Sequence, residues 1–414
     1  MLILKQIGRW IYVNNFNVIV NDLLYTKLSY IKKDARFMPN PEWAIVRLYK
    51  KKMHKFPIGL LERVKSILNE KNIKYVLDIL SNQTSLEPVY GGLRPYQMSA
   101  LNIMIQNTNG IIKMPCASGK TKVTIQFIKN INLPTLVLVP TIDLVKQWKA
   151  QVGKNTHVKT YMGIKNKSYL QQFKLIICDE SHHVQCKTLQ KIGMNVREDA
   201  YIFGLSATPF DGAEPLKVEA VLGPIIYEIS IRELIEQGYL CDAKIHYHPL
   251  TKMESDHFLT YPMVYDDYIV ENNERNDKII ELAEKSKKPC LILINRIEHG
   301  EALCHLLSAT TDVTFIHGNS KKKHREDVNH DVIIATSIYD EGIDLPNLKT
   351  LIIAAGGKSA IKIVQRVGRL LRPAPGKPYA IIHDFKDSCR WLDTHYKNRR
   401  KILEKNFEVI DETN

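Results

Sequence analysis

Short, continuous runs of aliphatic and β-branched residues recur through most of this 414-residue chain, and they constrain its fold more than any other feature. Such runs are typical of parallel strands that are buried on both faces of a sheet. Segments with helical spacing of apolar residues lie between them. The runs form two groups, at 110–114, 135–140, 174–180 and 201–208, and at 290–295, 313–318, 331–337, 350–356 and 379–385. The sequence therefore predicts two α/β lobes, each built on a parallel sheet.

The segments outside the two groups define the expected domains. Residues 1–90 lack the alternation of strand and helix, and they hold 15 Lys and Arg against 7 Asp and Glu, a net charge of +8. We expect a small basic α+β domain there that binds nucleic acid. The expected remainder is a first lobe at 91–245, a linker at 246–276, a second lobe at 277–387 and one basic helix at 388–414.

Composition limits the classes of partner and location. The net charge of +14 favours a polyanionic partner over an acidic small molecule. No apolar run approaches the ~20 residues that a membrane span needs. The seven cysteines are scattered and never spaced as CxxC, which argues against a disulfide framework or a metal site and for a reducing cytoplasm.

The segment MPCASGKT, residues 114–121, follows a predicted strand and opens a predicted helix, which is the context of a phosphate-binding loop. Backbone N–H groups of the loop, at Ser118 and Gly119, are expected to face the phosphates. Lys120 would add a positive charge, and Thr121 would offer its hydroxyl to Mg²⁺. Because Met114 replaces the first glycine of the usual pattern, the motif by itself is only moderately specific.

Two carboxylates, Asp179 and Glu180, stand at the end of the apolar run 174–180. Residues in this position emerge at the carboxyl edge of a parallel sheet, where open α/β folds bind ligands. Asp179 would hold Mg²⁺, directly or through water, and Glu180 would orient and deprotonate an attacking water. The alternative is a pair of exposed acids at a helix start, but the phosphate loop upstream favours the catalytic interpretation.

Four further side chains are candidates for the same site. His182 follows the acids, and Ser206 and Thr208 end the next apolar run. We therefore expect these residues to link the acidic site to the part of the protein that moves. A zinc site at His182 and its neighbour His183 is disfavoured, because no third ligand lies at a useful spacing. Gln97 precedes the first lobe, and its amide could hydrogen-bond adenine.

The stretch QRVGRLLRP, residues 365–373, carries arginines without a phosphate loop beside it. Arg369 and Arg372 are three residues apart, so on a helix both guanidinium groups could reach one anion. The only plausible cradle for that anion is the loop at 114–121. The spacing therefore predicts two lobes that close on one nucleotide.

Taken in order, six motifs resemble those of the superfamily 2 helicases and translocases over residues 92–386, namely LRPYQ, CASGKT, DESHH, SAT, ATSIYDEGIDLP and QRVGRLLRP. The resemblance implies two RecA-like lobes with ATP and Mg²⁺ in the cleft. It implies that Gly342 and Asp344 lie closest to ATP. Gln365, Arg369 and Arg372 would act from the second lobe, where the arginines stabilise charge on the leaving phosphate. Expected contacts to the nucleic-acid backbone are Thr141, His317, Gly318 and Thr336.

Within the superfamily, the stretches VPTIDLVKQW and DEGIDLPNL are similar to the branch of XPB-like and phage UvsW-type DNA helicases. Residues 43–68, a basic run that leads into an amphipathic helix, resemble the small DNA-binding domain at the front of UvsW-type proteins. The lysines expected to hold duplex DNA are Lys50, Lys51, Lys52 and Lys55. The basic clusters at 321–323 and 399–401 are expected to add phosphate contacts.

We therefore expect an ATP-dependent DNA helicase or translocase that remodels forks and branched recombination intermediates. It would act as a monomer in the cytoplasm, that of a bacterial host if a phage encodes it. An RNA helicase is the main alternative, because a motor that grips the backbone distinguishes the sugars weakly. The motor subunit of a restriction or transcription complex, and a DNA-binding protein with a decayed ATPase, are the others.

Overall fold

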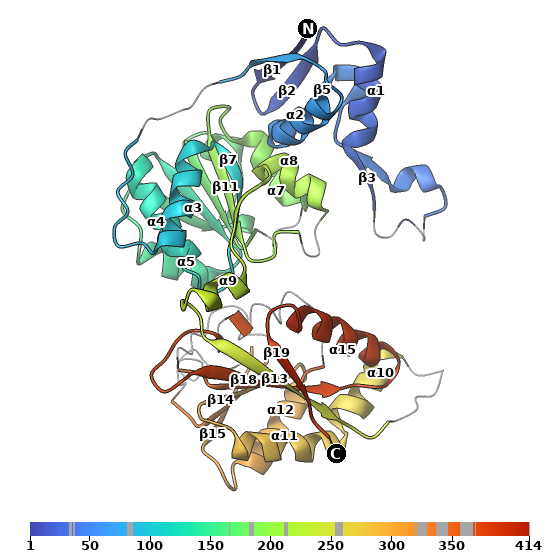
Figure 1. The fold of residues 1–414 in the computed structure, drawn as a ribbon, viewed down its shortest axis with the longest axis vertical. Coiled ribbons are helices and arrows are strands. Elements are labelled where there is room, and N and C mark those ends of the chain that lie inside the picture. Colours follow the sequence, from blue (N-terminus) through green and yellow to red (C-terminus); the bar gives the residue numbers. More distant parts are fainter. Residues whose placement is uncertain are drawn as a thin grey trace. The chain divides into compact units, whose positions relative to one another are not determined.

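The computed structural model describes residues 1–32, 35, 38–80, 86–164, 166–181, 186–210, 214–252, 260–318, 320, 329–336, 347–356, 367–368 and 370–413. Helices and strands carry the labels of Figure 1. The chain divides into two compact units, of which the first contains Met1–Met114 and Gly119–Ile229 and the second contains Pro115–Ser118 and Ser230–Asn414. No helix in the described ranges is long and apolar enough to cross a membrane.

The first 80 residues form an α+β domain within the first unit. Its sheet has the order β5-β2-β1-β6, with β1 (Leu2–Ile7), β2 (Trp10–Asn14), β5 (Lys55–Pro57) and β6 (Tyr75–Asp78). The other elements are α1 (Val18–Lys27), β3 (Ser29–Ile31), η2 (Pro41–Ala44), β4 (Ile45–Arg47), η3 (Lys51–Met53), η4 (Ile58–Leu60) and α2 (Leu61–Glu70). Leu2 and Leu4 of β1 and Ile11 and Val13 of β2 are buried at alternate positions, as a sheet with one face toward a core requires.

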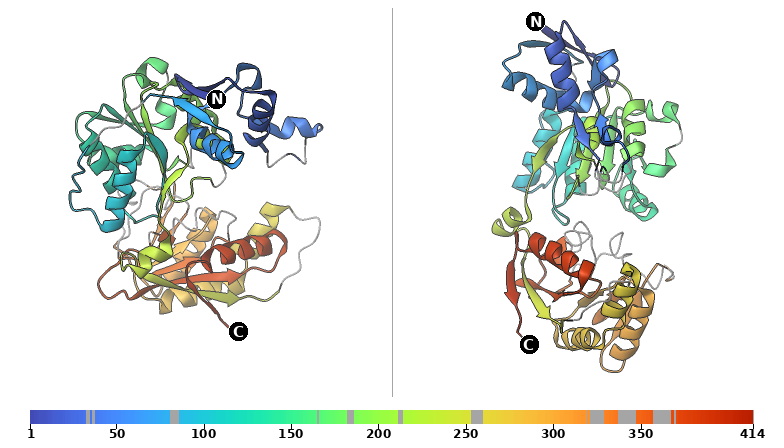
Figure 2. Two further views of the ribbon diagram at one scale, coloured as in Figure 1. Left: turned by 45° about the horizontal axis from the view of Figure 1, so that its top comes forward. Right: turned by 90° about the vertical axis from the view of Figure 1, so that its right-hand side faces the viewer.

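The rest of the first unit is an α/β lobe on a parallel sheet. The described strands have the order β12 (Ile225–Glu228), β7 (Asn109–Lys113), β11 (Tyr201–Ser206), β10 (Leu175–Asp179), β8 (Thr135–Val139) and β9 (Thr156–Thr160). The helices are α3 (Pro95–Gln106), α4 (Lys120–Ile131), α5 (Ile142–Lys149), η5 (Tyr161–Gly163), α6 (Lys167–Leu170), α7 (Cys186–Asn195) and α8 (Pro215–Leu222). Figures 1 and 2 show α3, α4 and α5 on one face of the sheet and α7 and α8 on the other. Because both faces are covered, β8, β10 and β11 are buried along their whole length.

The second unit contains a second parallel sheet. Its described strands have the order β15 (Val313–Ile316), β16 (Val332–Ala335), β14 (Cys290–Leu293), β17 (Thr350–Ile353), β18 (Tyr379–Lys386), β13 (Asp242–Pro249) and β19 (Glu408–Asp411). The helices are α9 (Ile231–Glu236), α10 (Tyr261–Tyr265), the π-helix η7 (Asp266–Val270), α11 (Asn273–Lys285), α12 (Ile297–Leu307) and α15 (Arg390–Leu403). All nine predicted apolar runs form strands in one sheet or the other, so the predicted fold of two parallel-sheet lobes is confirmed.

The expected domain boundaries differ from the structure in two places. The second unit begins at Ser230, and β13 pairs with β18 and β19 in its sheet, so the expected boundary at 245 falls inside a strand of the second lobe. The basic tail is not one helix, because α15 ends at Leu403 and β19 follows it. β13, with the sequence DAKIHYHP, alternates polar with apolar residues, and β19, with the sequence EVID, has only two apolar residues. Both therefore lack the longer apolar run by which the other strands are recognised.

One face of the β13–β18 pair carries three histidines. His248 Nε2 lies 2.9 Å from His383 Nδ1, and His246 Nδ1 lies 2.6 Å from Glu412 Oε1. Burial lowers the pKa of His248 to about 4 and the pKa of His383 to about 3. With both pKa values well below 7, the two rings are neutral in the folded protein near pH 7, so that one ring nitrogen donates and the other accepts.

We expect the second unit to lose stability as the pH falls below about 6.5. An unfolded histidine takes up a proton near pH 6.5, whereas His248 and His383 stay neutral in the folded protein until the pH approaches 4. The unfolded state binds more protons in this window, so the free energy of unfolding falls by at most about 1.4 kcal/mol per pH unit for each histidine. Urea denaturation at pH 7 and pH 5 measures the loss. His383→Gln should make this decrease in unfolding free energy smaller, and His305→Gln, at an exposed position, should leave it unchanged. If the decrease is the same in the two variants, the buried histidine pair is not its cause.

Candidate functional site

The predicted phosphate loop connects β7 to α4. Positive φ angles at Ala117 (63°) and Gly119 (83°) turn the chain so that α4 begins at Lys120. The loop is tied to the neighbouring strand, because the Met114 N–H donates to the Ser206 carbonyl oxygen at 3.2 Å. Gly119 has no side chain to cap α4, and the start of a helix after such a loop is a favourable position for an anion.

Gln97 lies against this loop. A Cβ at position 119 would be 2.4 Å from Gln97 Nε2, so a side chain larger than that of Gly119 does not fit beside the amide. Gln97 is only 3% exposed, and its Oε1 accepts the Arg94 N–H at 3.0 Å within the capping box of α3. Ser118 Oγ donates to the Pro115 carbonyl oxygen at 2.6 Å. The predicted contact of Gln97 with adenine stays a prediction, but its position beside the loop suits that role.

Lys120 is buried, with 8% of its surface exposed. Its Nζ donates to the Met114 carbonyl oxygen at 3.0 Å. The positive charge also lowers the pKa of Asp179, so the two groups lie close enough to interact. Thr121 follows in the first turn of α4 and is half-buried. A phosphate is a stronger partner for a buried ammonium group than a neutral carbonyl, and the loop is therefore suited to a phosphorylated ligand.

Asp179 and Glu180 follow β10 at the carboxyl edge of the first sheet. Trp148 Nε1 donates to Asp179 Oδ2 at 2.8 Å, and the Glu180 N–H donates to Oδ1 at 2.9 Å. The Tyr161 hydroxyl donates to the Asp179 carbonyl oxygen at 2.7 Å. Burial, and then the charge of Glu180, raise the pKa of Asp179 to about 6, against the opposing effects of Trp148 and Lys120. A divalent cation at this carboxylate would favour its ionised form.

Two features of this acid pair were not predicted. Glu180 has a φ angle of 45°, a conformation that is uncommon outside glycine and is concentrated at functional sites. Trp148 and Tyr161 hold Asp179 from elements that follow β8 and β9. For Trp148 the only sequence signal is its position four residues after Leu144 on a predicted helix, which indicates burial but not a hydrogen bond. Nothing in the sequence marks Tyr161.

Ser206 and Thr208 follow one another at the end of β11. Ser206 is fully buried, and its Oγ accepts the Thr208 N–H at 3.0 Å. Thr208 Oγ1 is buried without a hydrogen-bond partner among the residues that the structure describes. With the Met114 N–H bonded to the Ser206 carbonyl, the end of β11 is joined directly to the phosphate loop. His182, the third predicted coupling residue, lies outside the described residues.

In the second unit, the structure describes only part of the predicted site. His317 and Gly318 follow β15, and Thr336 follows the adjacent strand β16, so the three lie at one carboxyl edge. The His317 N–H donates to Ser320 Oγ at 3.0 Å. Arg372 is described and half-buried. The predicted residues outside the described ranges are Gly342, Asp344, Gln365, Arg369 and the lysines at 321–323.

The remaining predicted nucleic-acid residues belong to the first unit. Thr141 is the N-cap of α5, and its hydroxyl accepts a backbone N–H of the first turn at 3.4 Å. Lys51 pairs with an aspartate of α1, and Lys55 donates to a tyrosine hydroxyl of β2 at 3.0 Å. Lys50 and Lys52 are exposed. Of the four lysines, these two are therefore the better placed for a phosphate contact.

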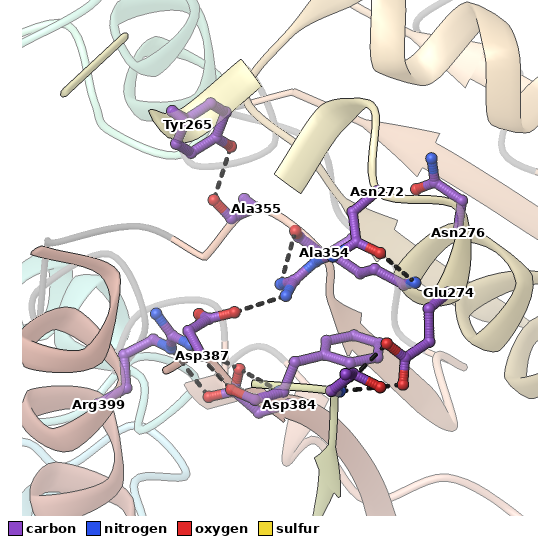
Figure 3. A network of polar contacts seen from close by, with 12 residues as sticks. Tyr265, Asn272, Glu274, Asn276, Ala354, Ala355, Asp384, Asp387 and Arg399 are labelled. Carbon is purple, nitrogen blue, oxygen red and sulfur yellow. Dashed lines mark hydrogen bonds and ion pairs between the residues drawn. The ribbon is translucent and has the colours of Figure 1, made fainter. Parts of the chain in front are cut away.

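The expectation for the cluster at 399–401 is wrong for Arg399, which is 1% exposed. Arg399 Nε donates to Asp384 Oδ2 at 2.9 Å and its Nη2 donates to Asp387 Oδ2 at 3.0 Å. Arg275 donates to the same Asp387 and, at 3.1 Å, to the Ala354 carbonyl oxygen. Figure 3 shows this network between α15, the end of β18 and the end of β17. These buried arginines hold the second lobe together and cannot reach DNA.

Two protein-family models match the chain. "Type III restriction enzyme, res subunit" matches residues 91–169 and 161–211, and "Helicase conserved C-terminal domain" matches residues 274–374. The matched segments together cover more than half of the chain and contain the phosphate loop, the acid pair and Arg372.

Curated relatives and solved structures are similar over most of the chain. A DNA 3'-5' translocase XPB2 of Sulfurisphaera tokodaii is 26% identical over an alignment of 347 residues, and the match covers 68% of this chain and 78% of the relative. The ATP-dependent DNA helicase uvsW of Enterobacteria phage T4 is 24% identical over an alignment of 389 residues, and the match covers 80% of this chain and 74% of the relative. The structure of Saccharomyces cerevisiae Dbp5 bound to RNA and ADP BeF3 shares the fold, with a TM-score of 0.54, 16% identity and coverage of 85% and 93% of the two chains. The chain therefore belongs to the superfamily 2 helicases, and it is an ATP-dependent helicase with relatives of the UvsW and XPB types.

Proposed function

We propose that this helicase acts on DNA and remodels branched molecules such as forks and recombination intermediates. The observation that carries the proposal is the basic α+β domain that is built into the first unit. It shares a hydrophobic core with α8 of the lobe, so it is part of the motor body. The two curated relatives described above are a DNA translocase and a DNA helicase, which supports DNA as the substrate.

The donor set of the first lobe fits ATP with Mg²⁺. The start of α4, the buried Lys120 and the backbone of Gly119, which lies against Gln97, would form a cradle for phosphates. Asp179 and Thr121 would hold the metal, which when bound neutralises charge on the β- and γ-phosphates. Glu180, next to Asp179, would orient the attacking water and take its proton.

The second lobe would complete the reaction. Arg369 and Arg372 would stabilise charge on the leaving phosphate, with Gln365 beside them. Binding of ATP would then favour closure of the lobes and hydrolysis would favour opening. Each lobe would change its grip on the DNA backbone through His317, Thr336 and Thr141 in the course of this cycle.

A side-by-side comparison of ATPase stimulation tests this proposal. Forked DNA, plain duplex DNA and single-stranded RNA are added at the same nucleotide concentration and the same salt. We expect forked DNA to stimulate most. Equal or greater stimulation by RNA would favour the RNA-helicase alternative. If none of the three nucleic acids stimulates the ATPase, the protein is not a nucleic-acid motor. Strand displacement on a fork and on a tailed duplex then tests the preference for branches.

Alanine at both Lys50 and Lys52 should weaken DNA binding in a salt-dependent way. Each lysine that neutralises a phosphate contributes about 1 to the slope of log affinity against log salt, so the slope should decrease by about 2. Fluorescence anisotropy with a labelled fork between low and moderate salt measures this slope. The double variant Lys71→Ala, Lys74→Ala removes the same charge at other exposed positions of the domain and serves as the control. Equal slopes in the two double variants would exclude Lys50 and Lys52 as DNA contacts.

A further inference from the structure

Helix α8 belongs to two hydrophobic cores at once. Val218, Val221 and Leu222 pack in the core of the first lobe beneath its parallel sheet. Leu216 and Ala220 pack in the core of the N-terminal domain. In Figure 1 the helix lies between α7 of the lobe and α2 of the domain. A displacement of the N-terminal domain therefore acts directly on α8. Protein interiors are close-packed, and for this reason they transmit strain from one element to the next.

The packing of α8 is tight on both sides, against a glycine of the domain and a glycine of β11. A Cβ at Gly59, on η4 of the N-terminal domain, would lie 2.2 Å from the Glu219 carbonyl oxygen and 2.6 Å from that of Ala220. A Cβ at Gly204, on β11, would lie 2.6 Å from Leu222 Cδ1. The first contact is with helix backbone, which cannot move aside as a flexible side chain can. The N-terminal domain thus packs directly on α8, and α8 packs directly on β11, with no room for a side chain at either glycine.

An ion pair fastens the domain to α8. Arg63 of α2 donates from Nε to Glu219 Oε1 at 2.9 Å and from Nη2 to Oε2 at 2.6 Å. The Glu219 side chain is only 6% exposed, whereas that of Arg63 is 45% exposed. Because a buried carboxylate needs its charge partner, this pair strongly favours one register of the domain on the helix.

The domain also contacts the start of the segment that runs from Ala200 through β11 to α8. Arg9 is buried, and its Nη1 donates to the Ala200 carbonyl oxygen at 3.2 Å. Ala200 directly precedes β11, and β11 ends at Ser206. The N-terminal domain thus contacts the chain immediately before β11 and the helix that follows it.

From β11 the contacts continue to the phosphate loop. The Ser206 carbonyl accepts the Met114 N–H at 3.2 Å, and the Met114 carbonyl accepts a hydrogen bond from Lys120 Nζ at 3.0 Å. A contiguous series of packed groups and hydrogen bonds therefore leads from Arg63 through α8 and β11 to the lysine of the nucleotide site. Each step lies within the first unit or its immediate loop.

We propose that Arg63 and Glu219 are positioning residues that couple engagement of DNA by the N-terminal domain to ATP turnover in the first lobe. The inference rests on the proposed function, since it requires that DNA stimulates the ATPase. It differs from simple docking of a domain, because the contacts converge on β11, which ends at Ser206 two residues before Thr208, and on the phosphate loop. DNA held by the domain would bias β11 and Met114, and through them the position of Lys120.

The test separates coupling from binding and from folding. In the full-length protein, Arg63→Ala should lower the DNA-stimulated kcat for ATP by about 5-fold or more, the lower end of typical coupling effects. The DNA-free ATPase rate and the fork concentration for half-maximal stimulation should stay within about 2-fold, well below that coupling effect. Arg63→Lys should recover part of the stimulation, because it keeps the charge but not the two-point contact. Lys65→Ala, two residues further along α2 and paired only locally with Glu62, is the matched control.

A second variant covers the case in which Arg63→Ala does not fold because it leaves the Glu219 carboxylate buried and unpaired. Glu219→Gln removes that charge while Arg63 remains hydrated, and it should show the same selective loss of stimulation. Stimulation equal to that of the wild type in both variants would overturn the inference. So would a parallel loss of DNA-free and DNA-stimulated turnover, which would indicate a purely structural role. A wild-type enzyme that DNA does not stimulate would instead refute the proposed function.

Discussion

Replacing Glu180 with glutamine is expected to slow DNA-stimulated ATP hydrolysis by roughly 10²–10⁴-fold, the range that a positioned general base contributes. Glutamine has nearly the shape of glutamate and can still contact a water molecule, but it cannot take the proton. The substitution also keeps a non-glycine residue at the φ angle of 45°, so a backbone effect is not expected. Binding of ATP and DNA should survive, because Lys120 and the N-terminal domain are unchanged.

Single-turnover hydrolysis with bound ATP, next to equilibrium binding of a fluorescent ATP analogue, separates these effects. Glu228→Gln is the matched control, since Glu228 ends β12 at the edge of the same sheet, is exposed and pairs with Lys113. Its turnover should equal that of the wild type. A Glu180→Gln enzyme that unwinds forks at the native rate would show that the catalytic base is elsewhere. Loss of ATP affinity in the Glu180→Gln variant would show that the slower hydrolysis comes from weaker binding of ATP and not from loss of the general base.

Arg399→Met is expected to destabilise the second unit by roughly 3–5 kcal/mol, the typical cost of removing one partner from a buried ion pair. Methionine fills much of the volume, so the loss reports the charge and its hydrogen bonds. Burial raises the pKa of Asp384 and the charge of Arg399 opposes this effect. Without Arg399, both Asp384 and Asp387 would keep a carboxylate in the interior with fewer donors (Figure 3).

The adjacent residue supplies the control. Arg400 lies closer to the surface and pairs with Asp411 and Glu404, so Arg400→Met should cost only about 0–1 kcal/mol for the same change in charge. Urea titration followed by hydrogen exchange at the amides of β13 and β18 isolates the second unit from the first. Equal losses in the two variants would mean that the buried network contributes no more than a surface pair.

Much of the fold could be predicted because its signals are local. A strand buried on both faces needs apolar residues at every position, and that run is visible without knowledge of its neighbours. Strand β13 escaped prediction because it carries polar residues at alternate positions, such as His246 and His248, and β19 because it has only two apolar residues. Their place in the sheet depends on the pairing of β13 with β18 and with β19 across more than 100 residues of chain, which no local pattern encodes.

The candidate site likewise contains residues that local sequence predicts and residues that only packing brings to it. Lys120 and Thr121 follow the loop after β7, and Asp179 and Glu180 stand at the end of β10, so the rule that parallel strands share a carboxyl edge brings the four together. The donors that orient Asp179 come from α5 and from the turn after β9. No spacing rule relates these positions, since only the packing of the helix and turn on the sheet places an indole N–H or a phenol O–H at a carboxylate.

The sequence by itself determined the two parallel-sheet lobes and predicted the phosphate loop and the acid pair, because each depends on residues that are adjacent in the chain. It also determined the helicase family through the order of its motifs. The tertiary structure alone decided that Arg399 is a buried structural cation, and that Arg63 and Glu219 join the N-terminal domain to α8. The physical reason is that burial and pairing of a charge depend on which distant segments pack around it, and a basic residue has the same letter in the sequence whether it meets water, DNA or a buried carboxylate.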